Sequence, residues 1–188
     1  MLVVALVCSA GGLEALRRAL APLPADFTGC VVIVQHQPPH ADRDLLASLL
    51  RRRTRLPVEV AIDGAPLRRG MVLVVPPGRH ALIDRDERIV LIPAGPVPPP
   101  RPSGDLLLTT LALAVGPRAV AVVLSGTGRD GATGASAVHR FGGTVIAADE
   151  ASSAHFGMPG ETIGRDDAVD HVLPVDDIAP LLTRLASR

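Results

Sequence analysis

The sequence contains no lysine, tryptophan or tyrosine, and phenylalanine occurs only as Phe27, Phe141 and Phe156. So few scattered rings exclude the stacking platforms that bind single-stranded nucleic acid and the aromatic cages that bind quaternary ammonium groups. Without lysine there is no G-x-x-x-x-G-K-[ST] phosphate-binding loop, because that motif requires its lysine. Nineteen basic residues balance nineteen acidic ones. The zero formal net charge therefore argues against nucleic acid as a partner.

Cysteine is also scarce, since Cys8 and Cys30 are too few to build a disulfide framework. They fall at the end of one predicted strand and at the start of the next. If those strands are parallel neighbours, the two thiols lie about 15 Å apart at the rise of a strand. A disulfide spans at most roughly 7 Å between Cα atoms. We therefore expect two free, reduced thiols.

Long apolar runs are missing as well. The N-terminal run over residues 2–7 is too short to span a bilayer, and no basic segment precedes it as in a signal peptide. We therefore expect no membrane insertion and a cytoplasmic location. Hydrophobic residues make up 47% of the 188 residues, which predicts a packed core in one domain covering residues 1–188.

Short β-branched apolar runs alternate with helical patterns along most of the chain. Helical spacing predicts a helix that begins near Leu13 and stops before Pro22, a second that Asp42 caps, and a third that Ser103 caps. Predicted strands cover residues 2–8, 30–34, 58–62, 71–75, 119–124 and 144–148. This alternation indicates an α/β fold with a doubly wound, mainly parallel (Rossmann-like) sheet.

Four further segments complete the prediction. Residues 81–84 and 88–92 flank a polar turn and predict an antiparallel hairpin within the sheet. The proline-rich stretch 93–103 is short enough to be a stiff loop over the domain. Residues 149–163 are polar and contain glycine, so we expect mostly loop, and an amphipathic helix closes the chain.

The first strand ends abruptly at Ser9, and Gly11 and Gly12 open the following helix. This strand, turn and helix place Ser9 at the carboxyl edge of the sheet, where open α/β sheets bind their ligands. Free backbone N–H groups at the start of a helix attract a phosphate or an oxyanion. Ser9 is therefore either a nucleophile or a residue of a phosphate-binding turn.

Two further polar side chains follow buried-type strands. His36 comes after the strand over residues 30–34, and Asp130 follows the strand over residues 119–124. With Ser9 they make a nucleophile, a base and an orienting carboxylate, if the three strands are neighbours. Each also has a plain structural explanation, because serine is common in turns, a loop histidine is unremarkable, and Asp130 could cap the next helix.

Two other motifs compete with this triad. Gly126, Gly128 and Gly131 form a G-x-G-x-x-G pattern between a strand and a helix, and Asp149 stands where a dinucleotide site has its acidic residue. That pattern comes late, with too little chain after it to complete such a domain. His36 and His40 are four apart, but the prolines between them forbid a helix, so we expect no metal site.

Six stretches, in this order and over nearly the whole chain, resemble the catalytic domain of CheB-type chemotaxis methylesterases: Cys8-Ser9-Ala10-Gly11-Gly12-Leu13-Glu14-Ala15-Leu16, Val34-Gln35-His36, Val75-Pro76-Pro77-Gly78-Arg79-His80, Arg101-Pro102-Ser103, Leu124-Ser125-Gly126-Thr127-Gly128-Arg129-Asp130-Gly131-Ala132 and Phe156-Gly157-Met158-Pro159. The resemblance implies hydrolysis of glutamate methyl esters on chemoreceptors, and also glutamine deamidation. It further implies no cofactor, and as partner the cytoplasmic helices of a methylated chemoreceptor or another methylated signalling protein.

By this resemblance Ser9 is the nucleophile, His36 the general base and Asp130 the third member of the triad. The loop from Gly126 to Gly131 then delivers Asp130 instead of binding a pyrophosphate. For the oxyanion and the substrate we expect backbone N–H groups near Ala10 and Gly11, together with the Thr127 and Gly128 loop.

The chain departs from the family pattern at several positions. Val7 stands where the family has the first glycine of G-x-S-x-G, and Thr127 and Gln37 stand where methionines are common. The receiver domain typical of the family is not among these 188 residues, so we expect no built-in phosphorylation switch. These departures motivate one alternative, a catalytically silent CheB-like interaction domain in a signalling system.

Overall fold

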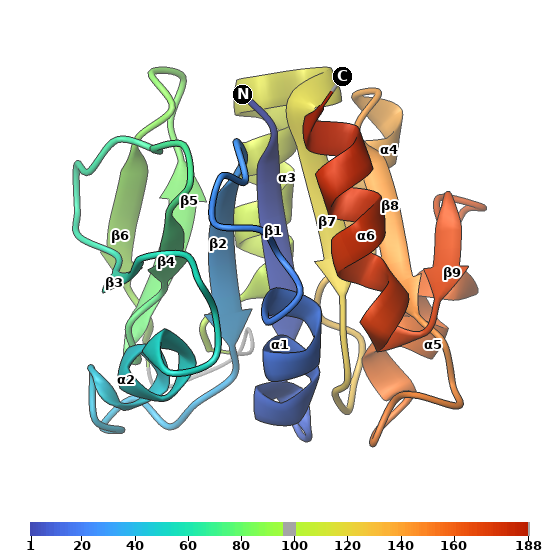
Figure 1. The fold of residues 1–188 in the computed structure, drawn as a ribbon, viewed down its shortest axis with the longest axis horizontal. Coiled ribbons are helices and arrows are strands. Elements are labelled where there is room, and N and C mark those ends of the chain that lie inside the picture. Colours follow the sequence, from blue (N-terminus) through green and yellow to red (C-terminus); the bar gives the residue numbers. More distant parts are fainter. Residues whose placement is uncertain (96–100, 188) are drawn as a thin grey trace.

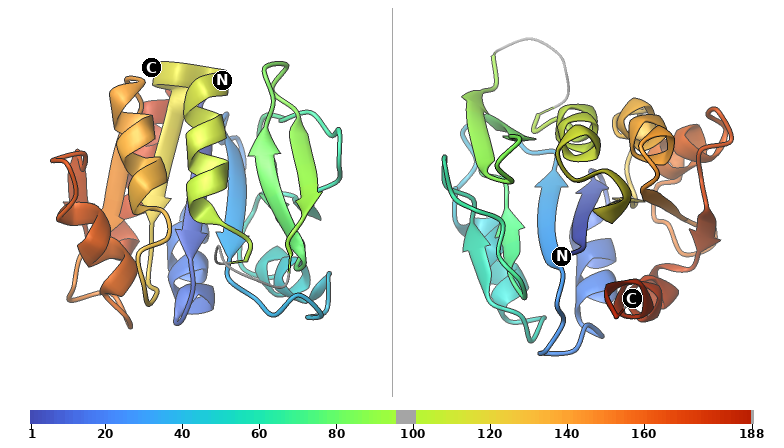
Figure 2. Two further views of the ribbon diagram at one scale, coloured as in Figure 1. Left: turned by 180° about the vertical axis from the view of Figure 1, so that it is seen from behind. Right: turned by 90° about the horizontal axis from the view of Figure 1, so that it is seen from above.

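The computed structural model describes residues 1–95 and 101–187. Within them, seven parallel strands form one sheet in the order β3-β4-β2-β1-β7-β8-β9, with helices on both faces (Figures 1 and 2). The predicted α/β fold with a doubly wound, mainly parallel sheet is confirmed. The strands are β1 (Val3–Cys8), β2 (Cys30–Gln35), β3 (Val58–Val60), β4 (Val72–Val74), β7 (Ala119–Val123), β8 (Thr144–Ala148) and β9 (His171–Leu173).

The sheet has its switch point at β1, because the chain first builds outward through β2 and later returns to β1's other side with β7. The pairing continues past the strand ends at this point. The His36 N–H donates to the Cys8 carbonyl (3.0 Å), and the Ser9 N–H donates to the Ser125 carbonyl (2.9 Å). The carboxyl ends of β2, β1 and β7 are therefore locked side by side, which is where an open α/β sheet binds ligands.

Both faces of the sheet are covered, which explains why its strands are continuous apolar runs. On one face α1 (Gly12–Leu20), α2 (Leu45–Arg51) and α6 (Val175–Ala186) pack against Val4 and Leu6 of β1. On the other face, seen from behind in Figure 2, α3 (Gly104–Val115) and α4 (Ala132–Arg140) pack against Val3, Ala5 and Val7. The period-2 alternation of β1 thus divides its side chains between two apolar layers.

The remaining elements lie on the second face or near the sheet edges. They are the hairpin β5 (Arg79–Ile83) and β6 (Ile89–Pro93), the 3-10 turn η1 (Gly116–Arg118) and α5 (Gly157–Ile163). The hairpin is antiparallel as predicted, but it forms a separate two-stranded sheet instead of joining the main one. It packs against α3, so it closes the core on that side.

Two local predictions need correction. Residues 149–156 are loop, as predicted, but the rest of that stretch forms α5, which begins at Gly157. The glycines and Pro159 hide this helix from propensity, while burial of Met158 stabilises it. The cap of α2 is Asp44 and not Asp42, whose carboxylate instead accepts the Asp44 N–H at 2.9 Å. The predicted stiff loop over 93–103 lies partly outside the described residues.

The two cysteines are free, as predicted. Cys30 pairs with Val3 and Cys8 with Gln35 in the β1–β2 register, so the thiols lie at opposite ends of these strands. Burial raises the pKa of Cys8 far above its usual value and that of Cys30 to about 11, which makes both thiols poor nucleophiles. Among the described helices, none has the length and apolar character needed to cross a membrane.

Candidate active site

Ser9, His36 and Asp130 come from three adjacent strands. Ser9 directly follows β1, His36 directly follows β2, and Asp130 lies in the loop that joins β7 to α4. The structure brings the three together, and all of them line a cavity of about 450 Å³ at the carboxyl edge of the sheet. Thr127 and Gly128, in the β7–α4 loop, line the same cavity.

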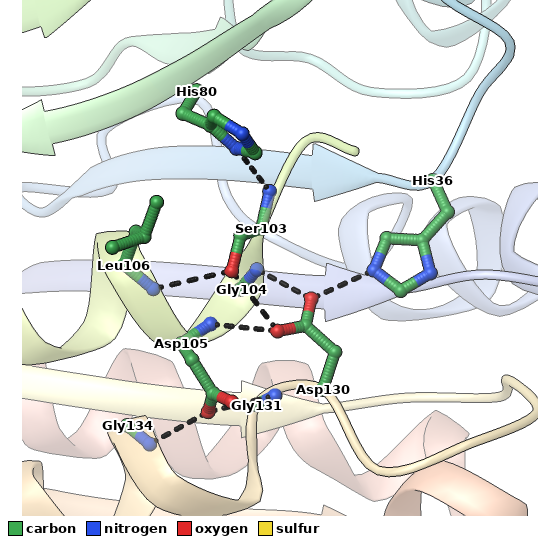
Figure 3. Close-up of polar contacts among 9 residues, drawn as sticks. All are labelled: His36, His80, Ser103, Gly104, Asp105, Leu106, Asp130, Gly131 and Gly134. Atoms are coloured by element: carbon green, nitrogen blue, oxygen red, sulfur yellow. Dashed lines mark hydrogen bonds and ion pairs between the residues drawn. The ribbon is translucent and has the colours of Figure 1, made fainter. Parts of the chain in front are cut away.

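The closest contact among them joins His36 to Asp130. The Nε2 atom of His36 lies 2.7 Å from Oδ2 of Asp130, as Figure 3 shows. A charged carboxylate can only accept a hydrogen bond, so the neutral ring carries its hydrogen on Nε2 and donates it to Asp130. Nδ1 then has a free lone pair that can accept a proton. Within the described residues Ser9 Oγ makes no hydrogen bond to His36. Such bonds are often long before substrate binds.

Asp130 also caps the first turn of α3. Its oxygens accept the N–H groups of Gly104 (2.6 Å) and Asp105 (3.0 Å) and the hydroxyl of Ser103 (3.1 Å), all visible in Figure 3. Burial raises the pKa of Asp130, but the bonds from His36 and from these two N–H groups outweigh it, so the pKa lies below its usual value. A helix N-terminus therefore holds this carboxylate charged and correctly oriented.

His80 of β5 supports the same arrangement from behind. This buried histidine accepts the Ser103 N–H at Nδ1 (3.0 Å), which fixes the residue whose hydroxyl bonds Asp130. Burial lowers the pKa of His80, and Arg101 lowers it further, although Asp130 acts in the opposite direction. A neutral ring is required here, since a protonated Nδ1 could not accept the N–H.

A second carboxylate caps α4. Oδ1 of Asp105 accepts the N–H groups of Gly131 (3.0 Å) and Gly134 (2.8 Å). Burial and the nearby charge of Asp130 raise the pKa of Asp105, against the lowering effect of these N–H groups. The helix that follows the G-x-G-x-x-G pattern thus already has an anion at its N-terminus.

The first glycine of that pattern also has a packing role. A Cβ on Gly126 would overlap Met158, so the missing side chain leaves room for Met158 and not for a pyrophosphate.

The N-terminus of α1 lacks such a cap. Its first residue is preceded by Gly11 in a left-handed conformation (φ 74°), which no residue with a Cβ adopts easily, and no side chain caps the helix. Within the described residues the N–H groups of Ala10 and Gly11 have no hydrogen-bond partner. Both residues border a second cavity of about 630 Å³ that includes Ser9 and His36. These free donors suit an oxyanion.

Ser125, buried at the end of β7, fixes the direction of one of these donors. Its hydroxyl donates to the Ala10 carbonyl (2.8 Å) and accepts the N–H of His155 (3.0 Å). Because a trans peptide points its C=O and N–H in opposite directions, holding the Ala10 carbonyl turns the Gly11 N–H away from Ser125. Ser125 therefore orients the turn that carries Ser9.

Val7 does not strain this turn. It lies within β1 in extended conformation, fully buried and paired with Val34 and Val123 on either side. The unusual backbone conformation falls on Gly11 instead. The Val7 side chain occupies the space beneath the start of α3, where a Cβ on Gly104 would overlap it. The valine is thus matched by a glycine on the opposing helix.

Sequence reasoning missed three of these positions. Ser125, His80 and the capping role of Asp105 had no local signal, because their partners lie at least 23 positions away along the chain. His80 and Ser125 do occur within the stretches on which the family resemblance rests. In the described part of the chain no group of three or more His, Cys, Asp or Glu side chains is placed to hold a metal ion.

The fold and the site define a doubly wound α/β protein that carries the groups of a serine hydrolase at its switch point. Comparison with known proteins narrows this class. The family model described as CheB methylesterase matches residues 4–182. The crystal structure of the Thermotoga maritima CheB methylesterase catalytic domain superposes with a TM-score of 0.91 at 33% identity, over 97% of each chain.

Curated relatives agree with this result. Protein-glutamate methylesterase/protein-glutamine glutaminase 1 of Myxococcus xanthus is 43% identical over 190 residues, which cover 100% of this chain and 54% of that protein. Protein-glutamate methylesterase/protein-glutamine glutaminase 2 of Rhizobium johnstonii is 41% identical over 181 residues, which cover 95% of this chain and 49% of that protein. The chain therefore belongs to the CheB methylesterase family. It spans about half the length of these curated relatives.

Proposed function

We propose that residues 1–188 form a single catalytic domain that hydrolyses γ-methyl esters of glutamate side chains, with Ser9 as nucleophile. One observation carries the proposal. Ser9 lies in one cavity with an imidazole that Asp130 holds at 2.7 Å, and it lies in the turn that leads into α1, which no side chain caps within the described chain. A base and an open anion site beside a serine hydroxyl are the requirements of acyl transfer.

In this mechanism Nδ1 of His36 takes the Ser9 proton as Oγ attacks the γ-carbonyl carbon. Asp130 keeps the hydrogen on Nε2 and stabilises the imidazolium that forms. The N–H groups of Ala10 and Gly11 bind the oxyanion, and the Thr127–Gly128 loop lines the same cavity. In comparable sites one such donor lowers the barrier by about 3–4 kcal/mol.

The tetrahedral intermediate collapses when His36 returns its proton to the departing methanol. Water then attacks the acyl-enzyme, His36 accepts a proton from it, and glutamate is released with Ser9 regenerated. The same sequence on glutamine expels ammonia, which accounts for a deamidase activity. None of these steps calls on a metal or a cofactor. The substrate is a methylated chemoreceptor or another methylated signalling protein in the cytoplasm.

The test is methanol release from a methylated receptor fragment, comparing the parent with Ser9→Ala. Loss of the nucleophile is expected to reduce kcat by at least about 10⁴-fold. Ser187→Ala, an exposed serine near the chain end, is the matched control and is expected to keep full activity. Equal release from parent and Ser9→Ala would refute the assignment. No release from either would favour a catalytically silent interaction domain.

A further inference from the structure

A further concave surface lies along α1 and extends to the end of that helix that is remote from Ser9. It is a cleft of about 470 Å³ between the C-terminal half of α1 and the loop that follows α2. Five arginines and one acidic residue line it. The lining side chains, which we call the arginine groove, are Glu14, Arg17, Arg18, Ala21, Arg52, Arg53, Thr54 and Arg55.

The loop that carries three of these arginines is held in place. The Thr54 hydroxyl donates to the Leu20 carbonyl at the end of α1 (3.4 Å) and accepts the Leu56 N–H (3.2 Å). Arg51 donates from Nε to the Val58 carbonyl (2.9 Å), which ties the end of α2 to β3. The groove is therefore a fixed feature of the fold, and a ligand would not have to order this loop.

The positive charge of the groove is only partly compensated. Arg17 pairs with Glu14, and Arg18 binds Asp176 through two bonds of 2.6 and 2.9 Å. Arg52, Arg53 and Arg55 are exposed, and within the described residues they form no ion pair. In a chain of zero net charge this is a local positive field, which attracts an anionic partner.

The groove is continuous with the candidate active site. Glu14 and Arg17 line it, and the same two residues line the 630 Å³ cavity that contains Ser9 and His36. The path between them follows α1, which starts at the carboxyl edge of the sheet beside Ser9 (Figure 1). At a rise of 1.5 Å per residue, α1 spans about 13 Å. A ligand that extends over about this length can therefore contact the arginine groove and the Ser9 cavity at the same time.

We propose that the arginine groove docks an acidic segment of the protein substrate while its methylated glutamate enters the cavity at Ser9. This rests on the proposed function. Guanidinium groups match carboxylates in bidentate geometry, which favours Asp and Glu side chains as the ligand. A substrate helix laid along α1 would place its acidic residues roughly 7 to 11 positions from the ester, two to three turns away.

The experiment uses two synthetic helical peptides that carry one γ-methyl glutamate. One has glutamates 7, 8 and 11 positions from the ester, and the other has glutamines there. The parent is expected to hydrolyse the acidic peptide with about tenfold higher kcat/KM, mostly through KM, as a few exposed ion pairs would provide. The variant Arg52→Glu with Arg53→Glu and Arg55→Glu is expected to lose that preference while cleaving p-nitrophenyl acetate at the parent's rate.

The matched control is Arg68→Glu with Arg69→Glu, two exposed arginines just before β4 that do not line the groove. It reverses charge without touching the groove and is expected to keep the tenfold preference. Equal cleavage of both peptides by the parent would overturn the proposal. An equal loss in the groove and control variants would overturn it as well, because net charge would then be the cause.

A binding assay separates this proposal from the esterase function. The acidic peptide, made with methionine in place of the ester so that it cannot be hydrolysed, is labelled with fluorescein and titrated with each protein at low and high salt. Affinity is expected to fall with salt and to be about tenfold weaker for the groove variant alone. Unchanged affinity in that variant would overturn docking even if esterase activity is found. Equal affinity for a short duplex DNA would assign the groove to nucleic acid instead.

Discussion

The chain has two glycine-rich turns that join a buried central strand to a helix, and they serve opposite purposes. After β7, the loop over residues 124–131 leads into α4, whose first N–H groups are bound by Asp105. After β1, the turn from Ser9 to Gly11 leads into α1, whose first N–H groups no carboxylate binds within the described chain. The same sequence signal thus marks a closed anion site in one turn and an open one in the other.

The difference comes from α3, which packs beside α4 on one face of the sheet, while α1 lies on the other face. The first turn of α3 receives Asp130 from the β7–α4 loop, and it supplies Asp105 to that same loop's helix. This exchange of carboxylates gives hydrogen-bond acceptors to the free N–H groups at the starts of α3 and α4, and it orients Asp130 toward His36. An incoming anion is left with the start of α1, beside Ser9, and with the Thr127–Gly128 loop.

The largest expected effect on activity comes from replacing Asp130, one of the two exchanged carboxylates. Asp130→Asn keeps the shape but cannot hold a charged imidazole, so kcat for ester hydrolysis is expected to fall about 10⁴-fold, as in a comparable Ser-His-Asp triad. Steady-state kinetics with the methylated receptor fragment measure this. A variant within tenfold of the parent would show that Asp130 is only a helix cap.

Ser125 links the two turns, and its removal is the next largest change. Ser125→Ala frees the Ala10 carbonyl, so the Gly11 N–H is no longer oriented toward the oxyanion. A decrease in kcat of about tenfold with KM nearly unchanged is expected, because the donor acts mainly in the transition state. If KM rises and kcat stays constant, Ser125 shapes substrate binding and not the oxyanion site.

Replacing Asp105 tests the turn before α4 separately from the triad. Asp105→Ala removes the acceptor for Gly131 and Gly134 at the start of α4, and should lower the free energy of unfolding by about 1–2 kcal/mol. Activity should change by less than tenfold, in contrast to Asp130→Asn. Chemical denaturation read by circular dichroism gives the stability. A loss of activity as large as that at Asp130 would mean that the two carboxylates are not separable.

His80 gives the smallest effect and a pH signature. Its pKa is lowered in the folded state, so the unfolded chain binds its proton first, and stability falls as the pH drops below about 6.5. His80→Asn, which offers an oxygen at the place of Nδ1, should remove this slope between pH 7 and 5. The pKa of Asp130 is also lowered, and its contribution is lost only at still lower pH, so the two are separable. An unchanged slope in the variant would contradict the role of His80.

Much of this arrangement follows from sequence patterns, and the rest depends on contacts between distant residues. Buried strands and the polar residues after them predict that Ser9, His36 and Asp130 share an edge. The same patterns cannot show that Asp130 binds Nε2 of His36, or that Asp105 reaches across to α4, since those contacts join residues 26 to 94 positions apart. The α5 helix escaped prediction because tertiary burial, and not propensity, stabilises it.

The central claim is that Ser9 is an activated nucleophile beside the open helix start. Labelling with a serine-directed fluorophosphonate, followed by mass spectrometry of the digested protein, tests it most directly. The account predicts one covalent adduct, on Ser9, which is lost in Ser9→Ala and forms much more slowly in His36→Ala. An adduct on another serine, or labelling that proceeds undiminished without His36, would contradict it.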